Sequence, residues 1–315
     1  MRIVVCKECG KENLLATGEK YEKCEYCGTP PTSSGTASRR MLIGISATVI
    51  SLVIVLAVTL IYLFTVHNVT VDGVRYQKKG NSYIVASQSV DLKGEVEIKS
   101  KVKGKAVTAI SSEAFTGTRV TSVIIPASVK NIGEKAFSNC DTLETVTMNV
   151  GLEKIGKYAF YHCDNLVSAT LPSGVKEIGD SAFYGCTRLD NVVIPSTVKA
   201  IGSTAFSRCA MLSNLVIENG VKSIGYAAFE ECTRLAEVTL PDSVESIGMR
   251  AFYRCSIMRT LNIGSGIISI GESALEECVN LEVINYKGTE NNWSLVTKGD
   301  YWRKNAGEFT VNYVA

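Results

Sequence analysis

The sequence predicts an α/β solenoid of stacked repeats, preceded by a small cysteine-rich module and a single transmembrane helix. Three observations predict this organisation. Seven of the eleven cysteines recur every 23 residues, from Cys140 to Cys278. Two Cys-x-x-Cys-Gly segments lie within the first 28 residues, and residues 41–66 carry no charged side chain over 26 positions. With 20% charged residues and a net charge of +2, the chain lacks the basic surface expected of a nucleic-acid-binding protein.

The two cysteine pairs near the N-terminus have the spacing of a metal site. Cys6 and Cys9 form the first pair, Cys24 and Cys27 the second, and 14 residues separate them. Each Cys-x-x-Cys turn can present two thiolates to one ion, and two such turns make a tetrahedral sulfur site. The segment resembles a zinc ribbon, so we expect residues 1–28 to fold around one structural zinc ion. Iron–sulfur binding and thioredoxin-like chemistry are the alternatives, but a redox motif needs one pair in a larger βαβ unit.

Residues 29–66 predict a linker followed by a membrane span. Residues 29–40, TPPTSSGTASRR, are too poor in apolar groups to fold alone. Residues 41–66 exceed the roughly 20 residues with which a helix crosses a bilayer core of about 30 Å. A cleaved signal peptide would be shorter and nearer the N-terminus, and a buried soluble helix would show a polar stripe. Arg39 and Arg40 adjoin the span, which predicts a cytoplasmic N-terminus and extracellular repeats in a single-pass protein of the cell membrane.

The 23-residue unit has its own internal pattern, A-F-x-x-C-x-x-L-x-x-V-x-[IL]-P-x-[SG]-V-x-x-I-G-x-x. The phrase L-x-x-V-x-I alternates as a short strand does, and Pro or Gly ends it. We expect V-x-x-I-G to turn the chain and A-F-x-x-C to return it as a helical or 3₁₀ turn. Stacked units would bury their Phe, Leu, Val and Ile against one another and align their strands in a parallel ladder about 4.8 Å apart.

The recurring cysteine has a structural explanation. A column of identical positions inside a solenoid needs a small apolar side chain that tolerates copies of itself, and free cysteine behaves as one. Disulfides between neighbours are disfavoured, because parallel side-chain directions leave the Cβ atoms about 4.8 Å apart rather than about 3.8 Å. The odd number of thiols also leaves one over. We therefore predict a buried column of reduced thiols, with disulfide or metal use as the alternative.

The repeat unit resembles a known family. The 23-residue period and the phrases A-F-x-x-C and I-P-x-S-V-x-x-I-G resemble BspA-type leucine-rich repeats, from about residue 90 to residue 287. The tail, with Trp293 and Trp302, resembles the family's closing segment. The resemblance implies a right-handed leucine-rich-repeat solenoid of short parallel strands, turns and short helices that recognises proteins or surfaces and is not an enzyme. The chain also has no Walker loop, G-x-S-x-G elbow or H-E-x-x-H motif.

These observations divide the chain into six parts. The predicted parts are the zinc ribbon at 1–28, the linker at 29–40, the transmembrane helix at 41–66, an N-terminal capping hairpin and first-repeat region at 67–110, the leucine-rich repeats at 111–287 and a C-terminal cap at 288–315. A basic cluster between span and repeats either protects an edge strand from aggregation or contacts anionic lipid or wall polymer. Its members are Lys93, Lys99, Lys101, Lys103 and Lys105.

The outward positions of the strands, two per unit, are the predicted partner-binding surface. Their side chains are neutral apart from one Glu, which suits hydrogen bonds to a protein or glycan better than contacts to phosphates. They are equally the residues of ordinary soluble strands. The positions are Thr145, Thr147, Ser168, Thr170, Asn191, Val193, Asn214, Val216, Glu237, Thr239, Thr260 and Asn262.

The sequence thus predicts a membrane-anchored surface protein that recognises a protein or glycan partner, with adhesion as the most specific version. The alternative is an envelope signalling or assembly component in which the zinc ribbon contacts a cytosolic partner.

Overall fold

The structure, a computed structural model, describes residues 2–6, 8–16, 18, 20–30, 68–88 and 90–314. They belong to two compact units, one within residues 1–62 and one within residues 63–315. The predicted transmembrane helix at 41–66 and the predicted linker beyond Pro30 lie outside the described residues. Within the described ranges, no helix combines the length and the apolar character that a membrane span requires.

The first unit is a short hairpin joined to two cysteine turns. Strands β1 (Arg2–Val5) and β2 (Glu12–Leu15) pair antiparallel. In each turn the glycine after the second cysteine, Gly10 or Gly28, donates its N–H to the carbonyl of the first cysteine. Both glycines have φ near +70° (71° and 73°), a left-handed conformation that glycine adopts without strain. The glycine of the Cys-x-x-Cys-Gly motif is therefore a backbone requirement.

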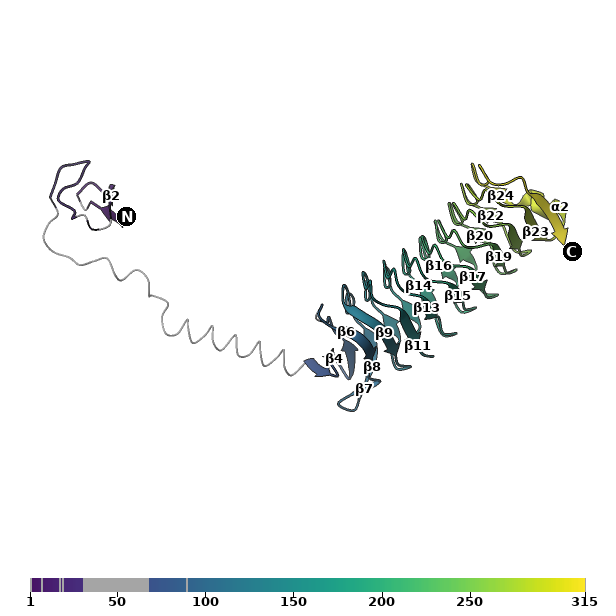
Figure 1. The fold of residues 1–315 in the computed structure, drawn as a ribbon, viewed down its shortest axis with the longest axis horizontal. Coiled ribbons are helices and arrows are strands. Elements are labelled where there is room, and N and C mark those ends of the chain that lie inside the picture. Colours follow the sequence, from purple (N-terminus) through teal and green to yellow (C-terminus); the bar gives the residue numbers. More distant parts are fainter. Residues whose placement is uncertain are drawn as a thin grey trace. The chain divides into compact units, whose positions relative to one another are not determined.

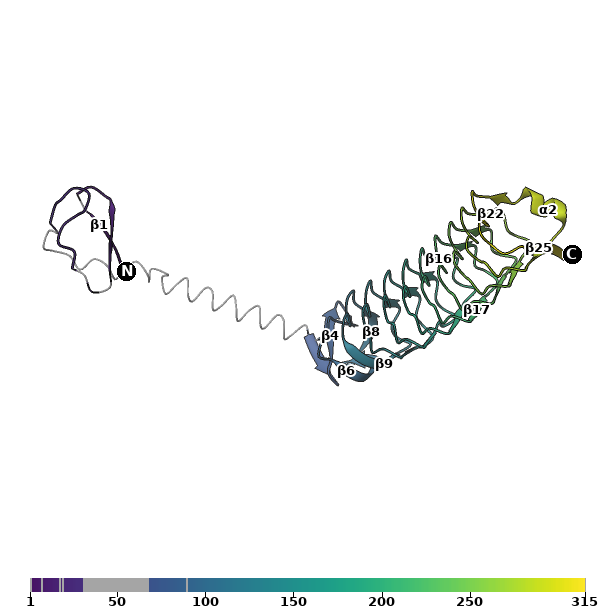
Figure 2. The same cartoon turned by 45° about the horizontal axis from the view of Figure 1, so that its top comes forward.

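The second unit is a solenoid whose repeats each contribute two short parallel strands. Figure 1 and Figure 2 show the two lines of strands running along the stack. The longer strands are β6 (Lys93–Glu97), β9 (Arg119–Ile125), β11 (Thr145–Met148), β13 (Ser168–Thr170), β15 (Asn191–Ile194), β17 (Asn214–Ile217), β19 (Glu237–Leu240), β21 (Thr260–Ile263), β23 (Val283–Lys287) and β25 (Thr310–Val314). The two-residue strands are β10 (Asn131–Ile132), β12 (Lys154–Ile155), β14 (Glu177–Ile178), β16 (Ala200–Ile201), β18 (Ser223–Ile224), β20 (Ser246–Ile247), β22 (Ser269–Ile270) and β24 (Thr297–Lys298).

The register of the strands follows the repeat. Val146 pairs with Ala169, and Val192 pairs with Leu215, so partners along the stack are one 23-residue period apart. The predicted parallel-strand solenoid is confirmed. The prediction for V-x-x-I-G was incomplete, because this phrase does more than turn the chain. Its isoleucine and the residue before it form the second line of strands, in which Ile132 pairs with Ile155.

The predicted helical or 3₁₀ turn at A-F-x-x-C is present only as single turns closed by hydrogen bonds between residues three apart, and no helix forms there. Ala136 donates its N–H back three residues to Gly133, at 3.3 Å, but Phe137 donates forward to Ala159 of the next repeat, at 2.7 Å. Lys135 and Asn139 have φ of 54° and 56°, and a left-handed residue at each of these points stops a helix from continuing. Alternate N–H groups are thereby directed to the neighbouring repeat. The predicted α/β class is therefore corrected: the described residues form a β-solenoid with one six-residue helix, α2 (Glu290–Leu295).

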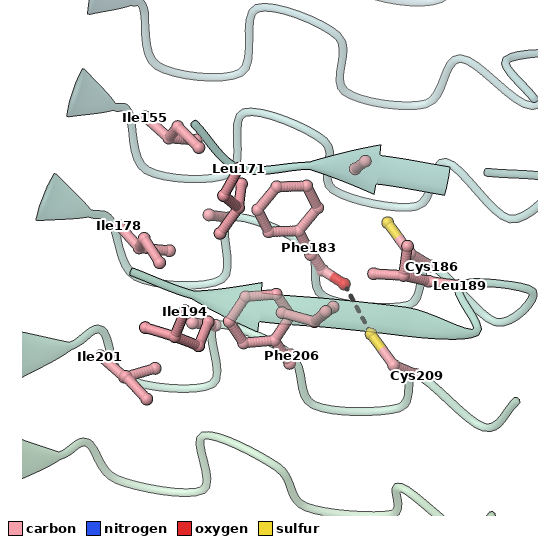
Figure 3. Packing of buried hydrophobic residues seen from close by; sticks show 14 of the residues in the cluster. Ile155, Leu171, Ile178, Phe183, Cys186, Leu189, Ile194, Ile201, Phe206 and Cys209 are labelled. Atoms are coloured by element: carbon pink, nitrogen blue, oxygen red, sulfur yellow. Dashed lines mark hydrogen bonds between the residues drawn. The ribbon is translucent and has the colours of Figure 1, made fainter. Parts of the chain in front are cut away.

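Two columns of side chains fill the interior. Seven phenylalanine rings, from Phe115 to Phe252, stack with centroids 4.8–5.5 Å apart and planes within 2–11° of parallel. The seven repeat cysteines are fully buried, which confirms the predicted column. Each donates its S–H to the carbonyl of the phenylalanine one repeat earlier, as Cys209 does to Phe183 at 3.2 Å (Figure 3). In the opening unit, which has no cysteine, buried Thr118 occupies the equivalent position.

The solenoid begins with antiparallel strands. Strands β3 (Asn68–Val71), β4 (Val74–Lys79) and β5 (Ser82–Val85) form two consecutive hairpins. Strand β5 then pairs parallel with β8 (Lys105–Ile110), which also pairs with β7 (Lys101–Val102). The antiparallel strands β3 and β4 therefore extend the sheet beyond β5 and β8, the first parallel pair of the solenoid.

The solenoid ends in a further, irregular rung. Strand β24 pairs with β22 and β25 pairs with β23, although the tail lacks the repeat phrase. Helix α2, which begins with a capping box at Thr289, places Trp293 against Tyr286 with ring centroids 5.2 Å apart. Trp302 accepts the N–H of Leu275 at 2.7 Å, the bond that an alanine accepts in the regular units. The tail thus continues the hydrogen bonding while large aromatic side chains close the core.

Candidate functional site

The first unit brings four thiols together. The Sγ atoms of Cys6, Cys9, Cys24 and Cys27 all lie within 4.8 Å of one another. Cys6 and Cys27 are 3.6 Å apart, and so are Cys9 and Cys24. An ion bound tetrahedrally by four thiolates at about 2.3 Å requires sulfurs roughly 3.8 Å apart. The four side chains therefore fit a closed metal site in which every coordination position comes from the protein.

Backbone N–H groups polarise these thiols unequally. The N–H groups of Cys9 and Glu8 lower the pKa of Cys6. Burial opposes ionisation of Cys24, but the N–H groups of Cys27 and Tyr26 outweigh it and lower its pKa to about 5. The pKa of Cys9 rises to about 12: the N–H of Lys11 lowers it, but burial and the other thiols together outweigh that effect. A bound cation would favour the thiolate form that metal coordination requires.

The first unit has almost no apolar core. Among its described residues, only Cys6, Cys24 and Asn13 are buried. Ile3 and Leu14 are instead 57% and 61% exposed. An apolar core of this size contributes little to stability. A group that joined the four thiols would therefore have to supply most of the unit's folding free energy.

Asn13 is a site residue that the sequence reasoning missed. Its Nδ2 lies 3.6 Å from Cys24 Sγ, and its Oδ1 accepts the N–H of Glu25 at 2.9 Å. It thereby joins the hairpin to the second cysteine turn. Tyr21 is a second such residue, because its hydroxyl is buried with no hydrogen-bond partner in the described structure. Burial, followed by the neighbouring thiols of Cys24 and Cys6, raises its pKa. An Asn between Cys-x-x-Cys motifs carries no sequence signal of such a role.

The longer strands form the predicted binding surface, here called the strand face. Of the twelve predicted residues, ten are exposed and two, Thr260 and Asn262, are half-buried. All occupy the outward positions of strands whose alternate residues are buried. Val193 and Val216 are 40% and 42% exposed in one column of this face. The strand face therefore offers neutral polar groups together with a small apolar patch.

The strand face consists of two sheets rather than one. Strands β6 to β17 form a six-stranded sheet and β19 to β25 a four-stranded sheet, and no pairing between β17 and β19 is found among the described strands. The two-residue strands β18 and β20 do pair, so the other line of strands is continuous there. The uniform repeat of the sequence did not predict this division.

A chain of asparagines runs along the four-stranded sheet. Asn285 donates its side-chain N–H to Asn262 Oδ1 at 2.8 Å, and Asn312 donates to Asn285 Oδ1 at 3.1 Å. Asn262 in turn donates to Glu237 and Thr239, at 2.8 and 3.0 Å. Asn285 and Asn312 were not among the predicted residues. Asn285 follows Asn262 by one 23-residue period, which was the available signal, whereas Asn312 lies in the tail, 27 residues after Asn285.

Comparison with protein families identifies the repeats. The BspA type leucine rich repeat region matches in six copies over residues 108–233 and 199–295, which together make up more than half of the chain. The chain belongs to this family. No curated protein matches the sequence.

Solved structures of leucine-rich-repeat proteins are similar to this chain. A leucine rich cell surface protein from Faecalibacterium prausnitzii A2-165 is 22% identical and has a TM-score of 0.58, over 78% of this chain and 76% of that chain. This likeness shows a shared solenoid fold. A T. pallidum leucine rich repeat protein is 22% identical over 73% of this chain and 85% of that one, with a TM-score of 0.41. The pneumococcal vaccine antigen PcpA is 18% identical over 79% and 88%, with a TM-score of 0.38.

The buried thiols of the BspA-type repeats should resist alkylation in the folded protein. Burial raises the pKa of Cys278 to about 12 and raises those of Cys163 and Cys209 well above the ordinary value, so these thiols form little thiolate at neutral pH. Hydrogen bonds from Cys163 and Thr118 lower the pKa of Cys140, which burial alone protects. Iodoacetamide treatment followed by peptide mass spectrometry should find all seven repeat thiols unmodified before denaturation and modified after it. Alkylation of Cys209 in the folded chain would contradict the buried column.

Proposed function

We propose that this protein is a membrane-anchored surface protein whose strand face binds a protein or glycan partner. The observation that carries the proposal is the character of the strand face, where neutral Thr, Ser and Asn side chains surround exposed Val193 and Val216. A surface of this kind has few charges to desolvate and offers both hydrogen bonds and apolar contact. It has no cluster of Lys or Arg that would favour phosphates. Adhesion is the most specific form of this function.

Membrane attachment belongs to the proposal. Residues 41–66 are long and apolar enough to span a bilayer, and Arg39 and Arg40 favour a cytoplasmic N-terminus with external repeats. The name of the F. prausnitzii structure, a cell surface protein, supports a surface location for the repeats. Deleting residues 41–66 should move the chain from the membrane fraction to the soluble fraction, and protease added to intact cells should remove the repeats.

A structural zinc ion in the first unit also belongs to the proposal. The tetrahedral spacing of the four sulfurs supports it, and thiolate ligands at both turns suit zinc. With all four positions supplied by protein, the ion would stabilise the unit and leave no open position for catalysis.

A second candidate function is envelope signalling or assembly through the first unit. Its exposed apolar side chains, including Ile3, Leu14 and Tyr26, favour it because a partner that covered them would remove apolar surface from water. Deleting residues 1–40 separates the two functions. An adhesin keeps its binding activity after the deletion, whereas a transducer loses its cellular effect.

The strand face is tested by placing charge on it. The detergent-solubilised full chain is applied to printed arrays of proteins and glycans, alongside the double variant Val193→Glu and Val216→Glu. Because the new carboxylates would have to be desolvated on binding, we expect a loss of at least about tenfold in affinity, or about 1.4 kcal/mol.

The matched control is the double variant Met211→Glu and Ile257→Glu. These side chains are also exposed and apolar, but they lie outside the strands. This control should bind like the parent, and both double variants should unfold within about 0.5 kcal/mol of it per substitution. Equal binding by the Val193 and Val216 variant would remove the strand face from the proposal.

A further inference from the structure

The four-stranded sheet carries a depression at the C-terminal end of the strand face. It has a volume of about 760 Å³ and lies across strands β19, β21 and β23. This volume falls within the range of about 300–1,000 Å³ typical of small-molecule sites. Leu240, Pro241 and Ile263 line it at consensus positions, whereas its polar walls come from side chains that the repeat consensus does not specify.

One wall is the asparagine chain. An asparagine amide has two N–H donors and an oxygen with two lone pairs. Asn285 uses one donor toward Asn262 and one acceptor position toward Asn312. One N–H and one lone pair of the half-buried Asn285 amide therefore remain for a ligand. Adjacent hydroxyls, each both donor and acceptor, match such a pair.

The opposite wall is an ion pair that cancels its own charge. Lys287 Nζ lies 2.7 Å from Asp242 Oδ2, and Asp242 Oδ1 accepts the N–H of Ser265 at 3.0 Å. Gly264 belongs to the repeat between those of Asp242 and Lys287, and four earlier units, including the previous one at Pro241, have proline at its position. A Cβ there would approach the backbone N of Asp242 to 2.5 Å. The wall thus offers charged hydrogen-bonding groups without a net charge that would select an anion or a cation.

Apolar groups complete the depression. Pro241 and exposed Val314 line it beside the polar walls. Neutral amides, a self-compensated ion pair and small apolar surfaces together match the hydroxyl edge and the C–H face of a sugar ring. A peptide main chain would pair better with a free strand edge than with side chains on the face of a sheet.

We propose that this depression binds a neutral sugar residue of a glycan chain. The inference rests on the proposed function and names the ligand class of one part of the strand face. Asn285 holds two hydroxyls, the ion pair of Asp242 and Lys287 holds the others, and Pro241 supports the ring.

The experiment presents the detergent-solubilised full chain with an array of neutral oligosaccharides, terminated by glucose, galactose, mannose or N-acetylglucosamine. Sialylated and sulfated oligosaccharides and a peptide array are the competing arms. We expect binding to neutral members, weakened about tenfold or more by Asn285→Ala because two ligand hydrogen bonds are lost. The neutral double variant Asp242→Ala and Lys287→Ala should weaken it similarly.

The matched control is Asn280→Ala. Asn280 lies in the same repeat, is exposed and donates to the carbonyl of Ser256 at 2.7 Å, but it is outside the depression. This variant should bind within about twofold of the parent, and the melting temperature reports folding in every case.

Three outcomes overturn the inference. Binding restricted to charged glycans or peptides, or neutral-glycan binding that Asn285→Ala leaves unchanged, would do so while the strand face itself could still function. A loss of binding in the Val193→Glu and Val216→Glu variant would show that the strand face still binds a partner although the depression does not bind a neutral sugar. The absence of any bound partner on either array would reject both the inference and the proposed function.

Discussion

Chelation of the zinc ion proposed above should unfold the first unit and leave the repeats intact. With only Cys6, Cys24 and Asn13 buried among its described residues, the unit would depend on the bonds between the proposed zinc ion and the thiolates. Structural zinc sites of this kind contribute about 10–16 kcal/mol of apparent binding free energy, far more than so small a core could replace. After chelation, amide hydrogen exchange in residues 2–30 should lose its protection.

The repeats provide an internal control for this result. Both tryptophans of the chain, Trp293 and Trp302, lie in the terminal rung of the solenoid, so their fluorescence reports the repeats alone. It should not change on chelation. Cys24→Ser should abolish the stoichiometric zinc measured by mass spectrometry, whereas Cys209→Ser should retain it. Exchange protection in the first unit that survives metal removal would show that no ion stabilises it.

Phe206→Ala should destabilise the solenoid by about 3–5 kcal/mol. Phe206 is fully buried between two parallel rings, with centroids 5.1 Å from Phe183 and 5.5 Å from Phe229. Truncation leaves a cavity in the middle of the stack, where hydrogen bonds to both neighbouring repeats keep the backbone from closing it. Urea unfolding followed by tryptophan fluorescence measures the loss.

Two further variants serve as controls for the Phe206→Ala measurement. Tyr226→Ala removes an exposed aromatic side chain from the adjoining repeat and should cost no more than about 0.5 kcal/mol. Phe206→Leu should cost less than Phe206→Ala, because Leu275 occupies the same column at its last regular position. A Phe206→Ala variant as stable as Tyr226→Ala would mean that the ring stack does not hold the repeats together.

Much of this architecture could be predicted because stacked repeats copy a local pattern. Alternation in L-x-x-V-x-I predicted which side chains face inward, and the structure buries Val192 and Ile194 while exposing Asn191. The 23-residue return of cysteine predicted a buried column, because identical positions in successive units lie above one another. The Cys-x-x-Cys spacing predicted the four-thiol cluster in the same way.

The turn side of the solenoid could not be predicted by this reasoning. A-F-x-x-C has helical spacing, and most of the left-handed residues that break the helix, such as Lys135, give no sequence signal because they are not glycines; only Gly117 and Gly185 stand at the position of Asn139. Hydrogen bonds to the neighbouring repeat hold them in that conformation. Local propensity alone would not, since the left-handed region costs most residues about 1 kcal/mol or more.

The sequence alone determined the period, the inward and outward positions and the ligands of the thiol cluster, because each of these depends on spacing along one chain. Tertiary structure alone decided the division of the strand face between β17 and β19, the asparagine chain that joins Asn262 to Asn285 and Asn312, and the ion pair across Gly264. These features depend on how side chains from different repeats meet, and contact between repeats is settled by packing and hydrogen bonding along the stack.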